Sequence, residues 1–306
     1  MQLKYKHKIS LLAFDLDGTL LNSAGRISVS HLHMIRSLMR QGVKVTLCSG
    51  RMPYALQVFV QQLGLRGPYV ACNGGLVIDS TDDSVLFCEP VVGTDVDQLC
   101  LHFREMGLHL CLQTQEGVYY SPGNPRVATP EQVRELAIRY SLPESEIRFL
   151  PEDYRYLDKH PVYKVALNVP EGYDFAQLAL YLDTQPRLSY AFSDKAFVEI
   201  NAQGTSKGQG IERVAAHYGI PLQEVCVFGD YDNDIPGFER AGVTIAMGNA
   251  SDNLKAKAMY VTDTNDNDGI GKALIALAGC IQFDGGCSKN PSEFAKINAV
   301  GGQQCL

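Results

Sequence analysis

The sequence of 306 residues lacks the features that mark several large classes of protein. It contains no run of about 18 apolar residues, so nothing in it predicts a helix that spans a membrane. Its nine cysteines include no Cys-x-x-Cys pair and lie mostly in apolar runs, which predicts buried free thiols in a reducing compartment instead of a zinc or disulfide framework. Its seven histidines show no metal-ligating spacing, and neither internal repeats nor low-complexity tracts occur.

Positive charge is also scarce. The chain has 27 Lys and Arg against 34 Asp and Glu, a net charge of −7, so a broad basic surface for nucleic acid is not expected. An acidic protein that acts on an anionic substrate needs local positive charge, from a metal ion or from a few placed Lys and Arg side chains. The apolar run near the N-terminus stops at Asp15, too early for a signal peptide, and we expect a cytoplasmic protein that is a monomer or a weak homo-oligomer.

Short apolar runs alternate with helical patterns over the first part of the chain. The runs 9–14, 43–48 and 69–72 predict buried strands, and the segments 29–39 and 53–63 carry apolar residues at helical spacing. Strands that are apolar throughout are typical of a parallel sheet covered on both faces by helices. The same alternation returns after Lys207, so the two ends of the chain are expected to share one sheet.

The middle of the chain has a different pattern, in which helices are mixed with half-polar strands. This pattern predicts an α+β domain inserted into an α/β fold with a doubly wound parallel sheet. We therefore expect a discontinuous core of residues 1–84 and 190–282, a cap of residues 85–189 and a flexible tail of residues 283–306.

Polar side chains follow the apolar runs at points where predicted strands end. In open α/β sheets, ligands bind beyond the carboxyl ends of the strands, so these side chains should meet at one edge of the sheet. Several carboxylates at one place repel one another unless a cation lies among them, and hard oxygen ligands favour Mg²⁺. The side chains concerned are those of Asp15, Asp17, Ser49, Lys207, Asp230 and Asp234.

This combination of residue types is typical of phosphoryl transfer. Of two carboxylates two positions apart, one can bind the metal and attack while the other transfers a proton. A lysine and a hydroxyl across the site would neutralise and hydrogen-bond a phosphoryl oxygen, and such charge stabilisation supplies most of the catalysis in these reactions. Taken singly, the residues have simpler interpretations, with Ser49 and Asp234 as helix N-caps and Arg51 as part of a surface ion pair.

Four stretches, in order along the chain, resemble the motifs of the haloacid dehalogenase-like hydrolase superfamily. Asp15–Leu21, which reads Asp-Leu-Asp-Gly-Thr-Leu-Leu, is similar to the first motif, and Ser49–Arg51 resembles the second. Lys207 resembles the third motif and Gly229–Asp234 the fourth. The resemblance covers about residues 8–282, and it implies a Rossmann-like core.

Further residues resemble the Cof-type branch of this superfamily, in which an α/β cap is inserted between the second and third motifs. They are the Ser-Gly-Arg-Met-Pro form of the second motif, the Asn73–Gly75 turn, Glu199-Ile200 ahead of Lys207-Gly208, and Asn267–Gly269. The residues that choose the substrate are expected in the cap, where the sequence contains no recognisable motif.

The resemblance implies a catalytic role for four of the matching residues. Asp15 is expected to be the nucleophile that forms an aspartyl-phosphate. Asp17 is expected to be the general acid and base, which protonates the leaving alcohol and then activates water. Ser49 and Lys207 are expected to bind the phosphoryl group.

The resemblance also implies the ligands of a metal ion and of the substrate. Mg²⁺ would be held by Asp15, the backbone carbonyl of Asp17 and Asp230, with Asp234 as a further ligand or as an acid next to the ligands. Residues that would bind substrate next to the phosphate are Gly50, Arg51, Asn73, Gly74, Lys207 and Asn233.

The function that these observations imply is a Mg²⁺-dependent phosphatase for small phosphomonoesters, such as sugar phosphates or phosphorylated cofactors like pyridoxal phosphate and flavin mononucleotide. Two alternatives stay open at this point. The first is a phosphomutase-like phosphotransferase with the same nucleophile. The second is a receiver-like module whose aspartate is phosphorylated but not turned over, although receivers lack a cap and a second aspartate at the position of Asp17.

Overall fold

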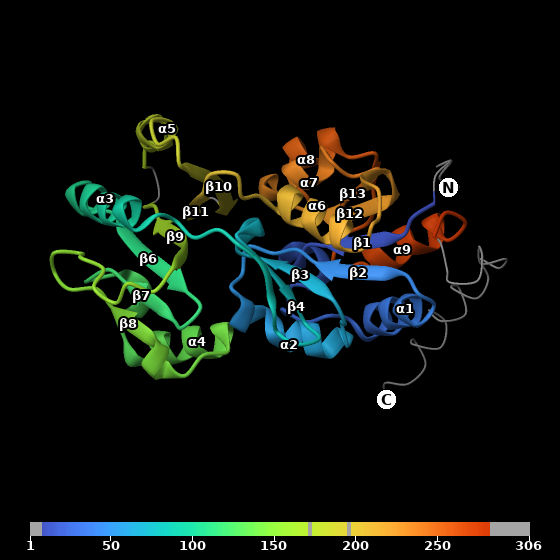
Figure 1. The fold of residues 1–306 in the computed structure, drawn as a ribbon, viewed down its shortest axis with the longest axis horizontal. Coiled ribbons are helices and arrows are strands. Elements are labelled where there is room, and N and C mark those ends of the chain that lie inside the picture. The colour runs from blue at the N-terminus through green and yellow to red at the C-terminus, as the bar shows by residue number, and fades with distance from the viewer. Residues whose placement is uncertain (1–7, 171–172, 195–196, 282–306) are drawn as a thin grey trace.

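A five-stranded parallel sheet forms the core of the computed structural model, which describes residues 8–170, 173–194 and 197–281. The predicted tail of residues 283–306 lies outside the described residues. The strand order is β14-β13-β12-β1-β2, so both ends of the chain share the sheet, as predicted (Figure 1). The strands are β1 (Leu11–Phe14), β2 (Lys44–Leu47), β12 (Val225–Gly229), β13 (Val243–Ala246) and β14 (Tyr260–Val261).

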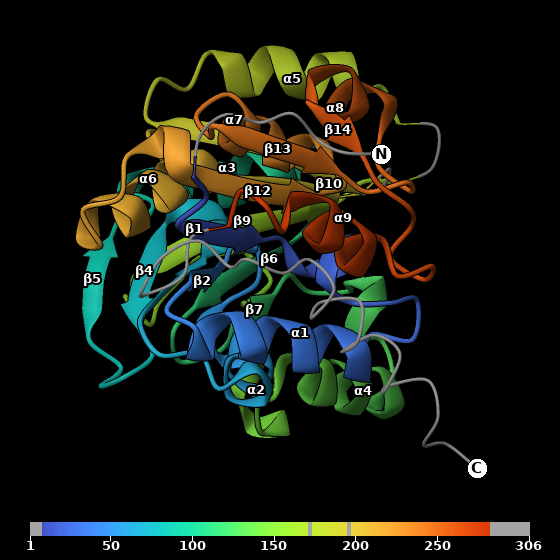
Figure 2. The ribbon, with the colours of Figure 1, turned by 90° about the vertical axis from the view of Figure 1, so that its right-hand side faces the viewer.

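Helices cover both faces of this sheet (Figure 2). Along β1, Leu12 and Phe14 pack into a hydrophobic cluster on one face, whereas Leu11 and Ala13 pack into another on the opposite face. Burial on both faces explains why β1 and the neighbouring β12 consist of apolar residues. This is the doubly wound arrangement predicted from the sequence. The first face is covered by α1 (Val29–Arg40), α2 (Pro53–Leu63) and α9 (Gly269–Leu277), and the second by α6 (Lys207–His217), α7 (Ile235–Phe238) and α8 (Asp252–Lys257).

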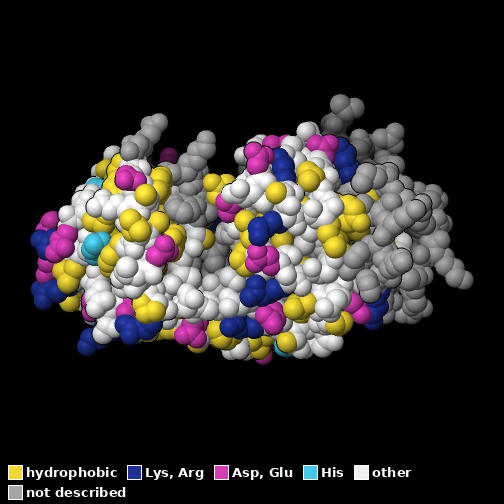
Figure 3. Space-filling view, turned by 90° about the horizontal axis from the view of Figure 1, so that it is seen from above, with side chains coloured by type: hydrophobic (Ala, Val, Ile, Leu, Met, Phe, Trp, Pro, Cys, Tyr) yellow, Lys and Arg dark blue, Asp and Glu magenta, His cyan; other side chains and the backbone are white. Residues whose placement is uncertain are grey.

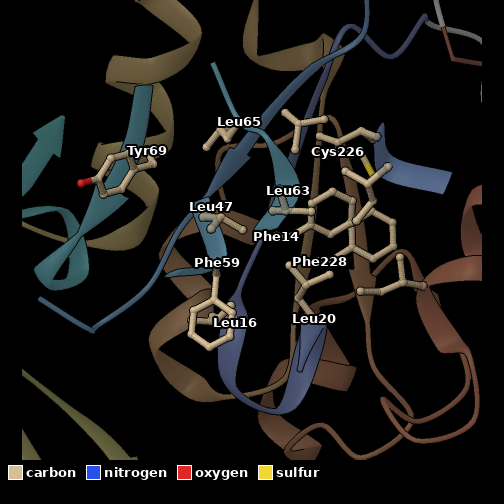
Figure 4. Packing of buried hydrophobic residues seen from close by; sticks show 14 of the residues in the cluster. Phe14, Leu16, Leu20, Leu47, Phe59, Leu63, Leu65, Tyr69, Cys226 and Phe228 are labelled. Carbon is tan, nitrogen blue, oxygen red and sulfur yellow. The ribbon is translucent and has the colours of Figure 1, made fainter. Parts of the chain in front are cut away.

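Aromatic packing on the first face holds two loops that carry carboxylates (Figure 4). Phe14 and Phe228 lie on neighbouring strands and stack with their ring centroids 4.8 Å apart. Both rings are fully buried, and burying such a side chain stabilises the fold by roughly 1.5–3 kcal/mol. Because Asp15 directly follows Phe14 and Asp230 follows Phe228 by two positions, this packing fixes the starting points of both loops.

Local sequence signals set the ends of the helices in this layer. The Oγ atom of Ser28 accepts a hydrogen bond from the backbone N–H of His31 at 3.1 Å and caps α1. Pro53 occupies the first turn of α2, and Gly64, with a φ of +67°, ends that helix.

A three-stranded antiparallel sheet extends the core beside β2. It consists of β3 (Pro68–Ala71), β4 (Leu76–Asp79) and β5 (Val85–Cys88). A parallel bridge between Cys48 and Val70 joins it to the end of β2. The turn between β3 and β4 is η2 (Cys72–Gly74), which places Asn73 and Gly74 near the carboxyl end of the main sheet.

The cap is built on a six-stranded sheet, at the left of Figure 1, in the order β10-β11-β9-β6-β7-β8. Leu112, Val165 and Ile200 point to the face covered by α3 and α5, and residues at alternating positions point to the other face. That second face is covered in part by α4. The elements are α3 (Gly93–Glu105), β6 (His109–Thr114), β7 (Val118–Tyr120), α4 (Pro130–Tyr140), β8 (Ile147–Phe149), β9 (Val162–Asn168), α5 (Phe175–Asp183), β10 (Leu188–Asp194) and β11 (Phe197–Ala202).

Strand pairing divides the chain at different positions from the sequence-based boundaries of 84/85 and 189/190. β5 lies in the range assigned to the cap, but it pairs with β4 next to the core. β10 and β11 extend into the range assigned to the core, but they pair within the cap sheet. The four residues of β5 are apolar but exposed or half-buried, and such a short strand carries no sequence pattern that tells which sheet it joins.

The described residues also show the state of the cysteines, the hydropathy of the helices and the distribution of surface charge. Five of the seven cysteines in the described ranges are buried, and none of these seven forms a disulfide. Within the same ranges no helix is both long and apolar enough to cross a membrane. On the face seen in Figure 3, acidic and basic side chains are interspersed, and no continuous basic surface is visible there.

Replacing Gly74 by alanine is predicted to destabilise the protein. Gly74 has a φ of +93°, and a Cβ atom at this position would overlap with the carbonyl oxygen of Ser206, the residue before α6. The strained backbone alone would cost about 1–3 kcal/mol, and the overlap adds to that cost. Thermal unfolding measures the effect as a fall in melting temperature.

Gly64→Ala is the matched control for this prediction. Gly64 also has a left-handed φ, but no atom lies within 4 Å of an added Cβ. A fall in melting temperature for Gly74→Ala that is no larger than the fall for the control would contradict the role of the close approach between η2 and α6.

Candidate active site

A cavity of about 360 Å³ lies where the carboxyl ends of the core strands face the cap. The core contributes mainly charged and polar groups to its lining, and these include most of the site residues predicted from the sequence. The cap contributes residues from β6, β9 and β11 and from the α4 region. From the core the lining includes Asp15, Asp17, Ser49, Gly50, Arg51, Lys207, Asp230 and Asn233, and from the cap Gln113, Arg126, Arg139, Tyr140, Lys164, Phe197 and Glu199.

A buried ammonium group joins two carboxylates at the base of the cavity. Lys207, the first residue of α6, is 3% exposed, and its Nζ donates hydrogen bonds to Oδ1 of Asp15 and to Oδ1 of Asp234, both at 2.6 Å. The other carboxylate oxygen of Asp234 accepts hydrogen bonds from the backbone N–H groups of Asp230 and Tyr231 at 3.0 and 3.2 Å. Asp234 therefore fixes both the lysine and the loop that follows β12.

The crowding of acids at this position changes their proton affinities. Burial, together with the nearby charges of Asp234 and Asp230, raises the pKa of Asp15 well above its ordinary value, although Lys207 acts in the opposite direction. Burial and the charge of Asp234 raise the pKa of Asp230 to about 6. Burial lowers the pKa of Lys207, but Asp15 and Asp234 together outweigh it and hold that pKa well above its ordinary value.

Three carboxylates are close enough to hold one metal ion. One oxygen atom from each of Asp15, Asp230 and Asp234 lies within 4.8 Å of the others. Oδ1 of Asp230 also accepts a hydrogen bond from Oγ1 of Thr19 at 3.0 Å. Gly18 has a φ of +77°, and a Cβ atom there would overlap with the carboxylate of Asp230, so glycine permits the two loops to approach. Hard oxygen donors and excess negative charge fit Mg²⁺.

The side chain of Asp17 lies outside this cluster of carboxylates. Its two oxygens accept hydrogen bonds from Nε and Nη2 of Arg51 at 2.8 and 2.6 Å, and the side chain is 55% exposed. Both residues line the cavity, so the ion pair that the sequence offered as a simple interpretation of Arg51 lies within the candidate site. An ion pair this exposed contributes little to stability.

Ser49 and Gly50 form the wall of the cavity after β2. Ser49 is buried, and its Oγ accepts a hydrogen bond from the backbone N–H of Arg51 at 3.2 Å. A Cβ atom on Gly50 would lie 2.9 Å from side-chain oxygens of both Asn73 and Glu199, so the wall has no room for a side chain at this position.

Two residues predicted to bind substrate, Asn73 and Gly74, are not among the residues that line the cavity. Asn73 lies behind the wall, where its amide donates to Oε2 of Glu199 at 2.7 Å and its Oδ1 accepts from Asn233 at 3.4 Å. The geometry thus connects Asn73 to the contact between core and cap. Asn233, in contrast, does line the cavity.

Residues from the cap complete the site. Glu199 stood out in the sequence only as a feature of the Cof-type branch, and Lys164 did not stand out at all. Nζ of Lys164 donates to the carbonyl oxygen of Gly50 at 2.7 Å and to Oε1 of Glu199 at 2.6 Å. Lys164 and Glu199, both in the cap, thereby bind the core loop Ser49–Arg51 and the turn that holds Asn73. Polar residues at alternating positions of otherwise apolar strands were the available signal, because they mark a second sheet face that does not pack on α3 and α5.

Comparison with known proteins agrees with this geometry. A family model described as haloacid dehalogenase-like hydrolase matches residues 12–274. The chain belongs to this family. The family predicted from the four motifs is therefore confirmed.

Two curated relatives are named phosphatases. Pyridoxal phosphate phosphatase YbhA of Escherichia coli (strain K12) is 27% identical over 267 residues, which are 87% of this chain and 97% of that protein. The 5-amino-6-(5-phospho-D-ribitylamino)uracil phosphatase YwtE of Bacillus subtilis (strain 168) is 28% identical over 279 residues, with 85% of this chain and 94% of that protein covered.

A solved structure from the same superfamily has the same fold. The phosphatase BT1666 of Bacteroides thetaiotaomicron is 26% identical, with a TM-score of 0.72 over 90% of this chain and 97% of that one. Together with the curated relatives, it confirms the predicted fold, a Rossmann-like core with a cap, and the predicted class of enzyme, a phosphatase.

The raised pKa of Asp230 predicts how stability depends on pH without metal. The pKa in the folded protein is about 6 and the ordinary value is 3.8, so the folded state binds this proton more tightly than the unfolded state. Its contribution to stability is therefore largest below about pH 4 and is lost as the pH rises to about 6. Asp230→Asn removes this dependence, so in EDTA the melting temperature of the variant should rise relative to the wild type between pH 4 and pH 7.

Asp97→Asn, on the exposed side of α3, is the control for this titration. It removes one carboxylate of the same kind outside the cluster of Asp15, Asp230 and Asp234, and its melting temperature is measured at the same pH values. Addition of Mg²⁺ at pH 7 should stabilise the wild type more than Asp230→Asn. If the melting temperature of Asp230→Asn differed from that of the wild type equally at pH 4 and pH 7, the proposed crowding of carboxylates would be contradicted.

Proposed function

We propose that this protein is a Mg²⁺-dependent phosphatase that hydrolyses small phosphomonoesters through an aspartyl-phosphate. The observation that carries the proposal is the buried Lys207 ammonium held between Asp15 and Asp234, with Asp230 beside them, at the base of a cavity closed by a cap. It combines a nucleophile, a cation for the phosphoryl oxygens and oxygen ligands for a metal ion within one site.

Residues of the core supply each step of this reaction. The carboxylate of Asp15 attacks phosphorus, and the bond from phosphorus to the alkoxy oxygen breaks as Asp17 gives its proton to that oxygen. Asp17 then takes a proton from the water that attacks the aspartyl-phosphate, which releases inorganic phosphate and restores Asp15. Lys207 and Ser49 bind the phosphoryl oxygens during both steps.

The carboxylate cluster fits Mg²⁺ because it offers hard oxygen atoms and crowded negative charge. Asp15, Asp230 and the backbone carbonyl of Asp17 would hold the ion. Asp234, whose two oxygens already bind Lys207 and two backbone N–H groups, would orient these groups from behind. When bound, the ion supplies positive charge that offsets the repulsion between Asp15 and the phosphate.

The ion pair between Asp17 and Arg51 suggests how the acid becomes available. Arg51 donates hydrogen bonds to both oxygens of Asp17, so this carboxylate is held by the guanidinium. A substrate phosphate next to Arg51 would compete for the guanidinium. Asp17 would then be released from the ion pair, so that it can carry a proton to the leaving group.

The size of the cavity and the names of the relatives point to a small substrate. A volume of about 360 Å³ is in the range of small-molecule sites and admits a phosphate with a compact organic group. The relatives named above act on pyridoxal phosphate and on a phosphorylated ribityl compound. Sugar phosphates and phosphorylated cofactors are therefore the compounds to test.

A phosphate-release assay across phosphorylated sugars and cofactors, with Mg²⁺ and with EDTA, tests this proposal. Inorganic phosphate should appear with Mg²⁺ and not with EDTA. Transfer of the phosphoryl group to an added sugar without release of phosphate would favour the phosphotransferase alternative. Equal rates with and without EDTA would contradict the metal site.

Substitutions of the two early aspartates should separate their roles. Asp15→Asn removes the nucleophile and should abolish turnover of p-nitrophenyl phosphate. Asp17→Asn leaves the nucleophile but removes the acid and base, and it should slow turnover by roughly 10²–10⁴-fold. Asp97→Asn, on the exposed side of α3, should keep wild-type activity. Full activity in Asp15→Asn would refute covalent catalysis.

A further inference from the structure

Two arginines of the cap line the same cavity as the proposed phosphate-binding residues of the core. Arg126 lies in the short helix η3 (Pro125–Val127), and Arg139 lies in the last turn of α4. Asp15, Ser49 and Lys207 come from the core, so the cavity has one charged end in each domain. The proposed phosphatase reaction uses only the core end and gives these arginines no role.

The two arginines differ from the other cations of the cavity in having no acidic partner. Lys207 is paired with Asp15 and Asp234, Arg51 with Asp17, and Lys164 with Glu199. Within the described ranges of the chain, neither Arg126 nor Arg139 forms an ion pair with a carboxylate. Positive charge at the cap end of the cavity is therefore available to a ligand.

The surroundings of Arg126 hold its guanidinium in place. Asn124 is buried, its Nδ2 donates to the carbonyl oxygen of Leu110 at 3.2 Å, and its Oδ1 accepts from the backbone N–H of Arg126 at 3.1 Å. The guanidinium carbon lies 4.4 Å from the centroid of the Phe197 ring, which also lines the cavity. A guanidinium stacked on a ring keeps its N–H donors in its own plane, where they can bind an oxyanion through two hydrogen bonds.

Arg139 adds a second positive charge to the lining of the cavity. It is exposed, and the next residue, Tyr140, is half-buried and lines the cavity as well. The helix dipole stabilises a cation in the last turn of a helix, so the position of Arg139 on α4 does not by itself indicate a ligand. The two arginines together indicate an anion-binding site because both line the same cavity.

We propose that Arg126 and Arg139 bind a second anionic group on the substrate, a carboxylate or a second phosphate, at the end remote from the phosphate that is cleaved. This inference rests on the proposed phosphatase function and narrows its substrate class to phosphomonoesters with two anionic groups. The core end carries four carboxylates in the lining or just behind it, which would repel a second anion there. Arg126 and Arg139, at the cap end, would attract this second anionic group.

Three compounds with the same 6-phosphate separate the sources of the second charge. Glucose 6-phosphate has one anionic group, 6-phosphogluconate adds a carboxylate and glucose 1,6-bisphosphate adds a phosphate. With Mg²⁺, the wild type should hydrolyse at least one of the last two with a kcat/KM about 10-fold or more above that for glucose 6-phosphate. Charge-assisted hydrogen bonds of this kind change affinity on the order of 10- to 100-fold.

Variants of Arg126 and Arg139 test whether these side chains cause the preference for a compound with a second anionic group. Arg126→Gln should lower kcat/KM for the preferred compound by roughly 10- to 100-fold and change that for glucose 6-phosphate less than about threefold. Arg139→Gln should act in the same direction by a smaller factor. Arg134→Gln is the matched control, since Arg134 lies on the same helix but pairs with Glu144 and is not among the residues that line the cavity.

Binding to an inactive variant separates failure of this inference from failure of the proposed function. In Asp15→Asn, calorimetry should find that 6-phosphogluconate or glucose 1,6-bisphosphate binds more tightly than glucose 6-phosphate, and that Arg126→Gln removes the difference. Turnover without any preference, or an equal loss for all three compounds in Arg126→Gln, would overturn the second anion site. Absence of turnover together with preferential binding would overturn the phosphatase and keep the anion site.

Discussion

The rest of the site depends on the interaction of the buried Lys207 ammonium with the carboxylates of Asp15 and Asp234. It lies 192 positions from Asp15 in the sequence, yet it joins that residue to Asp234 through two hydrogen bonds of 2.6 Å. Removing one partner from a buried ion pair costs about 3–5 kcal/mol, because a charge is left without compensation. The three carboxylates can be held this close because a cation lies between two of them, and the same crowding of negative charge fits the metal ion proposed for the site.

The core of the site was predictable because its residues follow buried strands. Asp15 follows β1, Ser49 lies shortly after β2 and Asp230 directly follows β12, so the parallel sheet brings them to one edge, as expected from the positions of the apolar runs. Asn73 and Gly74 were expected beside the phosphate, but neither is among the residues that line the cavity. Their close contacts with Glu199 and with the backbone of Ser206 depend on cap and helix positions that no local pattern specifies.

Cap residues were not predictable for a related reason. Lys164 and Glu199 occur in strands whose alternation predicts only that one face is polar, and it does not say which element that face meets. In the structure this face meets the loop after β2, where Lys164 donates to the carbonyl of Gly50. The position of the cap and the position of the loop after β2 are therefore linked by a direct hydrogen bond. The boundaries of the cap differ from the predicted ones because strand pairing, which composition does not reveal, decides which sheets β5, β10 and β11 join.

Detection of a phosphorylated Asp15 would test the account most directly. Wild-type protein mixed with excess substrate and Mg²⁺, quenched in acid within the first turnovers and digested, should yield a peptide that carries a phosphoryl group on Asp15. The same modification should be missing when EDTA replaces Mg²⁺. Turnover without phosphorylation of Asp15, or with the phosphoryl group on another residue, would contradict the central claim that this buried carboxylate, held by Lys207, is the nucleophile.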